Sequence, residues 1–525
     1  MPVARSFRIV VNVETVAPRL SILPEKSASR RRRRLSAEAA IKAFFGSNAL
    51  VAIVVLALIT IFLFREGFGF FGQNLANLRL YRRAGLEYVD IMRGQAQAHS
   101  ALVRALNDVR VRGGGGTTVE LDRFATQFSD AGEFLNALVS DAGDQALALR
   151  EAIAMREGRG GDINRGENDE APAAASPLNE EQSLAVLQAN TAKFAQITLS
   201  MGERIRALLN AAPRLSDAKS QASFEKWEKR VRDYLAGLPG AAQRLHEWNP
   251  RVPVPWYRSV ASFLFGKDWT TASFWQDWYG IIPLLVGSIM VASVALFIAV
   301  PFGVFSAIYV SEIAQRGEKS LIKPYIEFIS AIPSVVLGFF GIAVVGQAVR
   351  TASHLSILHW VPFFPISERL NVFTAGCLLA LMAVPTIFTL AEDALRNVPR
   401  GFKEASYALG ANRLQTIVRI LVPASLSGII SAILLGLGRV IGETMVVLLC
   451  AGNRIAIPDF TQGLGAFFQP VHTMTGIIAQ EMGEVVRGSI HYRALFMVGL
   501  VLFVLTLGIN YCAQKLVARY RMSIG

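Results

Sequence analysis

The chain has 525 residues, of which 52% are hydrophobic and 18% are charged, and its formal net charge is +13. Typical soluble proteins contain about 25% charged residues, so this composition excludes an ordinary soluble domain and favours a membrane protein. The basic excess does not call for a nucleic-acid partner. The run Arg30–Arg34 can be interpreted as a nucleic-acid patch, but beside an apolar segment it is better explained as a topology anchor.

Six runs with few or no charges are long enough to cross a bilayer, which takes about 17–25 residues. We therefore predict an all-α, polytopic membrane protein with six transmembrane helices in contact with membrane lipid. The runs are Phe44–Phe64, Ile281–Val310, Phe328–Val349, Val372–Leu390, Ile420–Gly452 and Ala494–Ala513.

Lysine and arginine are concentrated in alternate flanks of these runs: before the first, between the second and third, between the fourth and fifth, and after the sixth. Cytoplasmic flanks carry the excess of Lys and Arg in membrane proteins. Both termini are therefore expected in the cytoplasm, as tails of residues 1–43 and 516–525. Residues 44–66 form the first transmembrane helix, and residues 257–515 form the main transmembrane domain.

Residues 67–256 have a soluble composition, and this topology places them in the periplasm. We predict four amphipathic helices in a bundle, with breaks at Gly113–Gly116, at 158–180, and near Pro213 and Pro250. The helices are expected at 74–111, 118–156, 181–211 and 216–247. A near-heptad seam marks the third helix, and an aromatic and leucine face marks the second. They comprise Leu184, Leu187, Phe194, Ile197, Met201, Ile205 and Leu208, and Phe124, Phe128, Phe134, Leu135 and Leu138.

Two interpretations of this bundle remain open, namely a spacer or docking surface and a sensory domain. The aromatic residues that follow it favour an interfacial belt over a ligand cage. They are Trp256, Trp269, Trp275, Trp278 and Tyr279. The three cysteines lie in or beside predicted spans, and the six histidines have no metal-ligand spacing, so neither a disulfide framework nor a metal site is expected.

A basic loop near 394–423 follows the fourth run. It contains Glu404-Ala405-Ser406, Gly410, and then Ile420 and Pro423. This pattern resembles the EAA loop of ABC importer permeases, with Ser406 in place of the third alanine and Val422 in place of leucine. The resemblance implies a short helix that docks on a partner ATPase, with Lys403, Glu404, Ala405 and Gly410 as the coupling residues. Gly410 would allow a close turn after that helix.

Five further motifs are A-I-Y-V-S-E at 307–312, I-E-F-I-S-A-I-P-S-V-V-L-G-F-F-G at 326–341, E-D-A-L-R-N-V-P-R at 392–400, G-L-G-R-V-I-G-E-T-M at 436–445 and H-Y-R-A-L-F at 491–496. They resemble phosphate-importer permeases, and within that family the PstC-type subunit, because a methionine follows the Gly-Glu-Thr. The match covers about 258–515 and the first span.

This resemblance implies an ABC importer type I permease fold in a bacterial inner membrane. The implied partners are a second permease of PstA type, an ATPase dimer of PstB type and a phosphate-binding protein of PstS type. The sequence has no G-x-x-x-x-G-K-[ST] element. We therefore expect this chain to be a transport subunit and not an enzyme, and to bind no cofactor itself, with ATP and Mg on the partner ATPase.

Arg439 and Glu443 are two charges inside an otherwise apolar run, and such residues usually mark a substrate or ion pathway. A spacing of four predicts that both lie on one helical face, about 6 Å apart along the axis. We expect Arg439, Glu443 and Thr444 to line the substrate pathway, where the arginine would bind a phosphate oxyanion. The alternative is an intrahelical ion pair with a purely structural role.

Two other functions stay open at this stage. One is a permease for another oxyanion, such as sulfate, molybdate or phosphonate, because the external binding protein usually sets the choice of ligand. The other is a membrane sensor with an external helical bundle. Six spans and short cytoplasmic loops disfavour the sensor.

Overall fold

The computed structural model describes residues 26–112, 119–157, 180–213 and 218–520, apart from the single positions 272, 274, 359, 362 and 367. The predicted breaks at Gly113–Gly116 and within 158–179, and parts of both predicted tails, lie outside the described residues. The chain divides into two compact units, Met1–Phe62 and Leu63–Gly525.

The first unit contains the beginning of helix α1, Lys26–Arg83, which is 58 residues long. Its large apolar side chains from Ile41 to Phe62 are exposed, as expected for a helix that faces lipid. The helix begins well before the predicted start at Phe44, because the basic and alanine-rich residues ahead of it also favour helix.

In the part of the chain that the structure describes, six helical segments are long and apolar enough to cross a membrane, so the predicted all-α fold with six transmembrane helices is confirmed. The segments are Ile41–Arg83, Ile282–Ile313, Ser334–Ser353, Val372–Arg396, Arg413–Gly442 and Ile490–Ala518. The protein is a multi-pass membrane protein.

The third of these segments begins later than predicted. Residues 328–331 belong to the preceding amphipathic helix α10, Arg316–Ala331, and Ile332 has an extended backbone. Pro333 explains the break, since it lacks a backbone N–H and disfavours helix at the residue before it. The span itself consists of α11, Ser334–Phe340, a π-helical segment, Gly341–Val345, and α12, Gly346–Ser353.

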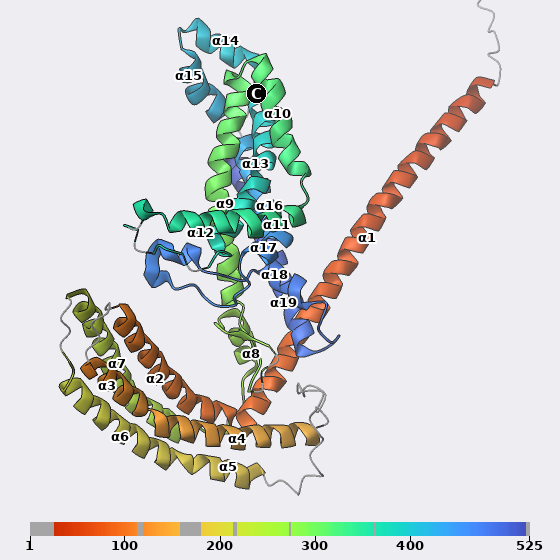
Figure 1. Ribbon diagram of the computed structural model, residues 1–525. Helices are drawn as coiled ribbons and strands as arrows, with labels where there is room; N and C mark the ends of the chain where they lie inside the picture. Colours follow the sequence, from red (N-terminus) through yellow and green to blue (C-terminus); the bar gives the residue numbers. More distant parts are fainter. Residues whose placement is uncertain are drawn as a thin grey trace, which may run out of the picture. The chain divides into compact units, whose positions relative to one another are not determined.

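Three helices form the centre of the transmembrane domain: α9, Ile282–Ile308, α13, Val372–Arg396, and α16, Val422–Gly442 (Figure 1). Close packing depends on glycine. A β-carbon at Gly303 of α9 would lie 2.8 Å from Ile387 of α13, and one at Gly436 of α16 would lie 2.7 Å from the same side chain. Small residues at such positions let membrane helices approach closely. The later helices are α17, Met445–Cys450, α18, Met474–Glu481, and α19, Ile490–Tyr520, with a 3-10 segment at Phe460–Phe468.

The segment after α1 is a helical bundle, in which the four predicted helices are divided further. Its helices are α2, Leu86–Arg112, α3, Val119–Asp130, α4, Glu133–Arg156, α5, Glu180–Gln188, α6, Asn190–Asn210, and α7, Ala218–Glu247. The prediction of a first helix over 74–111 is wrong, because α1 continues to Arg83. The chain then turns at Gly85, whose φ of +74° suits glycine.

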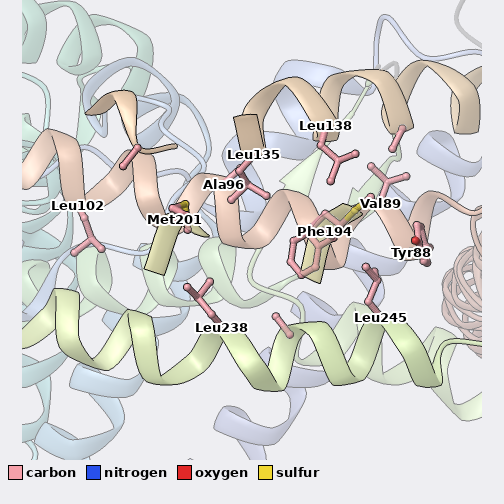
Figure 2. Packing of buried hydrophobic residues seen from close by; sticks show 14 of the residues in the cluster. Tyr88, Val89, Ala96, Leu102, Leu135, Leu138, Phe194, Met201, Leu238 and Leu245 are labelled. Carbon is pink, nitrogen blue, oxygen red and sulfur yellow. The ribbon is translucent and has the colours of Figure 1, made fainter. Parts of the chain in front are cut away.

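The predicted seam of the third bundle helix is confirmed (Figure 2). Leu187, Phe194, Met201 and Ile205 are buried in one apolar cluster, and the other seam residues pack against it. The predicted face of the second helix is buried too, except for Phe134, which is 58% exposed and lies beside the Arg204 guanidinium. Burial of these apolar side chains stabilises the bundle.

The predicted interfacial belt is wrong for most of its members. Trp256, at the start of α8, Trp256–Leu264, is exposed. Trp269 and Tyr279 instead pair in a two-stranded ribbon, β1, Trp269–Thr270, with β2, Trp278–Tyr279. Both are buried, with their rings edge to face at 5.4 Å. Trp275 and Trp278 pack against the bundle cluster. The strand register places these rings against protein, which sequence spacing alone does not show.

Candidate functional site

Arg439 lies near the C-terminal end of α16 and its side chain is exposed. Its guanidinium donates a long hydrogen bond, 3.4 Å, to the Thr386 hydroxyl of α13. Within the described part of the chain, no carboxylate forms an ion pair with it. The guanidinium therefore keeps most of its five N–H donors available for another group.

Glu443 does not share a helical face with Arg439, so that prediction is wrong. Helix α16 ends at Gly442, and Glu443 has an extended backbone with φ −74° and ψ 129°. The chain resumes as α17 only after Thr444. An intrahelical Arg439–Glu443 ion pair is accordingly not formed in the described structure. The uniformly apolar sequence on both sides concealed this break.

The interrupted backbone at 443–444 has polar neighbours. The Glu443 carbonyl oxygen accepts a 3.0 Å hydrogen bond from the Thr475 hydroxyl of α18. The Thr444 hydroxyl donates weakly, at 3.5 Å, to the Gly442 carbonyl. Non-helical backbone at membrane depth is tolerated where it is buried in protein or lines a water-filled cavity. Arg439 thus lies in the last turns of the fifth span, and Glu443 and Thr444 form the helix break directly after it.

The predicted coupling residues lie on a helix–turn–helix between α13 and α16, here called the coupling segment, residues 400–416. It consists of α14, Arg400–Ala408, and α15, Arg413–Thr416, which lie together at one end of the transmembrane helices (Figure 1). Gly410 has φ +79°, a left-handed conformation that glycine adopts without strain. The predicted close turn after the short helix is present at this glycine.

One surface of the coupling segment is apolar and exposed. Leu409 is 88% exposed, and Phe402, Tyr407 and Leu414 are exposed as well. Glu404 and Ala405 are also on the outside. Exposed apolar side chains rimmed by polar groups mark interaction surfaces in soluble regions of proteins.

Lys403 and Ser406 point inward instead. The Lys403 ammonium forms an ion pair with Glu312, with 2.7 Å between Nζ and Oε1. The Ser406 hydroxyl is buried and lies 2.9 Å from the Thr416 hydroxyl, which joins α14 to α15. The serine that stands in place of the motif's third alanine therefore links α14 to α15 on the buried side of the turn and adds no side chain to the exposed surface.

Glu312 and Thr386 were not singled out by sequence reasoning. Glu312 ends the A-I-Y-V-S-E motif, which carried the family resemblance but no assigned role. Thr386 follows Pro385 inside the fourth span. The sequence signal for Thr386 is a polar residue beside a proline within an apolar run. This signal is weak, because serine and threonine in membrane helices often only form hydrogen bonds with the backbone of their own helix.

Among the described residues, no three His, Cys, Asp or Glu side chains gather in a group that could hold a metal ion. Cys377, Cys450 and Cys512 are free thiols.

A family model described as "Binding-protein-dependent transport system inner membrane component" matches residues 299–521. The "Probable ABC transporter permease protein YqgH" of Bacillus subtilis (strain 168) is 36% identical over 249 residues, which cover 47% of this chain and 74% of that protein. The "Phosphate transport system permease protein PstC" of Pasteurella multocida (strain Pm70) is 30% identical over 272 residues, which cover 50% of this chain and 82% of that protein. PstC of Haemophilus influenzae is also 30% identical over 272 residues, with coverage of 50% and 84%.

A solved structure of the MetNI methionine ABC transporter, in an inward-facing conformation, aligns over 46% of this chain and 95% of that chain. Its sequence identity is 19% and its TM-score is 0.33. The assignment rests instead on the family match and on relatives that are at least 30% identical. These relatives confirm the resemblance that the motifs indicated. The chain therefore belongs to the binding-protein-dependent transport system inner membrane components, as a PstC-type ABC permease.

Proposed function

We propose that this chain is the membrane-spanning permease subunit of an ATP-driven phosphate importer. Its relatives from P. multocida and H. influenzae are named phosphate transport permeases. The observation that carries the proposal is Arg439, an exposed guanidinium inside the fifth span. Its only hydrogen bond to the described residues is the 3.4 Å contact with Thr386.

Arginine suits a phosphate pathway because its planar donors match two oxygens of a tetrahedral oxyanion and because it stays charged. A weak bond to a hydroxyl can be exchanged for a charge-assisted bond to phosphate at little cost. Glu443 and Thr444 lie just beyond the end of the same helix. In this proposal, Glu443 accepts a hydrogen bond from a protonated phosphate oxygen, and the Thr444 hydroxyl assists it.

The coupling segment is proposed to dock on an ATPase dimer, which binds ATP and Mg. The exposed surface around Leu409, Glu404 and Ala405 supports this role, since it joins apolar contact area to a charged rim. Gly410 sets the turn behind that surface, and Lys403 holds it from within.

The further partners we propose are a second permease of PstA type, an ATPase of PstB type and a periplasmic phosphate-binding protein of PstS type. The chain would lie in the bacterial inner membrane with both termini in the cytoplasm and residues 67–256 in the periplasm. The distribution of Lys and Arg between alternate flanks supports this orientation.

The test is uptake of radiolabelled phosphate by phosphate-starved cells that lack this chain, with and without the gene restored. Restored uptake that excess unlabelled phosphate abolishes, and that sulfate, molybdate and phosphonate leave unchanged, is the expected result. Unimpaired uptake in the deletion strain, in the absence of a second permease gene, would contradict the proposal. Competition by another oxyanion would reassign the substrate.

A further inference from the structure

Glu312 binds both helices of the coupling segment. It lies in the π-helical segment Tyr309–Ile313 that continues α9. Its Oε1 accepts hydrogen bonds from Lys403 Nζ of α14 at 2.7 Å and from the Ser311 hydroxyl at 3.1 Å. Its backbone carbonyl accepts a hydrogen bond from the Arg413 guanidinium of α15. We call Glu312, Lys403 and Arg413 the Glu312 clamp.

The ion pair in this clamp is largely shielded from water. The Glu312 side chain is 10% exposed and that of Lys403 is 28% exposed. Charge-assisted hydrogen bonds are about twice as strong as neutral ones. Removal of one partner from a poorly hydrated pair also leaves the other charge uncompensated. This pair therefore differs from the exposed ion pairs that contribute little to stability.

The clamp rests on a firmly packed base. Val310, two residues before Glu312, is 1% exposed, and Ile417 and Leu421, which follow α15, are 3% and 1% exposed. All three belong to one apolar cluster. Ile417–Leu421 is itself a π-helical segment, so the segment that holds Glu312 and the segment that follows α15 share this rarer geometry. Single π-helical turns inside α-helices are often found at functional sites.

The clamp links the coupling segment to a helix that the polypeptide does not connect to it. The chain joins α14 to α13 and joins α15 to α16. Lys403 and Glu312 are 91 positions apart, and the contact between them adds α9. Helix α9 packs closely on α13 at Gly303 and Ile387. A displacement of α14 that keeps the clamp intact must therefore move three central helices together.

We propose that Glu312 is the positioning residue through which movement of the coupling segment reaches α9. This inference rests on the proposed function of the coupling segment and deepens it. Without the clamp, the ATPase would still dock on the exposed surface of α14, but its movement would reach only α13 and α16. ATP hydrolysis would then be poorly coupled to transport.

The test uses the complete importer, purified with its partner subunits and reconstituted in liposomes with the binding protein outside. Phosphate uptake and ATP hydrolysis are measured together. Lys403→Met should lower uptake per ATP by at least about fivefold, the lower end of the usual range for coupling between sites. Lys403→Arg, which keeps the charge, should retain most of the coupling. The reversed pair Glu312→Lys with Lys403→Glu should recover most of what either single reversal loses.

The matched control is Glu228→Gln, which removes a 2.9 Å ion pair with Arg232 in α7, away from the clamp. It should leave uptake per ATP unchanged. Unchanged coupling in Lys403→Met would overturn the proposal. Loss of the ATPase from the purified Lys403→Met complex would overturn it too, because the pair would then only shape the docking surface.

Wild-type uptake tests the proposed function separately. A wild-type complex whose ATP hydrolysis responds to the binding protein, but which imports no phosphate, would contradict phosphate as the substrate. The clamp would then be judged by that response, which Lys403→Met should abolish and Lys403→Arg should keep.

Discussion

The imidazole of His99 lies directly over Gly132, so that a β-carbon at position 132 would come within 2.3 Å of His99 Cδ2. His99 is in α2, and Gly132 is the residue before α4. The same imidazole lies 4.9 Å from the ring of Phe128, measured between centroids. The turn between α3 and α4 is thus fitted to one buried histidine.

Gly132→Ala should destabilise the bundle by about 1–3 kcal/mol, because the histidine is held against Phe128 and cannot easily move away. Gly94→Ala is the control. Gly94 also belongs to the bundle, but a β-carbon there meets nothing within 4 Å, so the substitution should be neutral or stabilising. Hydrogen exchange of α2 and α4 peptides in the full-length protein measures both effects. Equal protection in the two variants would contradict this packing.

The stability of the bundle should fall at acidic pH because of His99. Burial lowers the pKa of the imidazole below its ordinary value, and the backbone of Ser129 and Phe128 offsets only part of this effect. The unfolded chain therefore takes up a proton first, below about pH 6.5. The free energy of unfolding should decrease from there until the pH reaches the lowered folded-state pKa, and then level off.

His99→Leu should remove this pH dependence, whereas substitution of the exposed His246 by glutamine should keep it. Hydrogen exchange of α2 at pH 7 and pH 5 provides the measurement. An identical pH response in wild type and His99→Leu would show that another group is responsible.

The buried seam of α6 should contribute strongly to the stability of the bundle. Phe194 is fully buried, whereas Leu199 on the same helix is 67% exposed. Phe194→Ala should cost about 3–5 kcal/mol, through lost burial and the cavity that remains. Leu199→Ala should change stability by less than about 0.5 kcal/mol. Denaturant unfolding of the bundle, followed by tryptophan fluorescence, distinguishes these values, and a similar loss in both variants would contradict the assigned seam.

Hydropathy and helical period predicted what depends on local sequence. Long apolar runs predict the six spans, and apolar residues at helical spacing predict the buried face of α6. The burial of Phe194 and Met201 was therefore predicted correctly. The helix boundary at Pro333 could also have been predicted, because proline disfavours helix at the preceding residue. It was missed because the uncharged run continues across it.

Contacts between distant segments could not be obtained in this way. The helix break after Gly442 has no proline to mark it, so Glu443 was placed on the wrong face. The contact between Lys403 and Glu312 joins residues 91 positions apart, which no periodicity reports. The tryptophans near residue 270 have the composition of an interfacial belt, but the pairing of β1 with β2 places Trp269 in the protein interior.

The most direct test of the central claim is phosphate uptake by assembled importers that carry Arg439→Gln or Arg439→Lys. Arg439 is proposed to bind phosphate inside the membrane, where loss of a charge-assisted contact is poorly compensated by water. The glutamine variant should lose uptake by at least about tenfold, and the lysine variant should retain part of it because it keeps the charge without the planar fork. Uptake at the wild-type rate by an Arg439→Gln complex of normal composition would contradict the account.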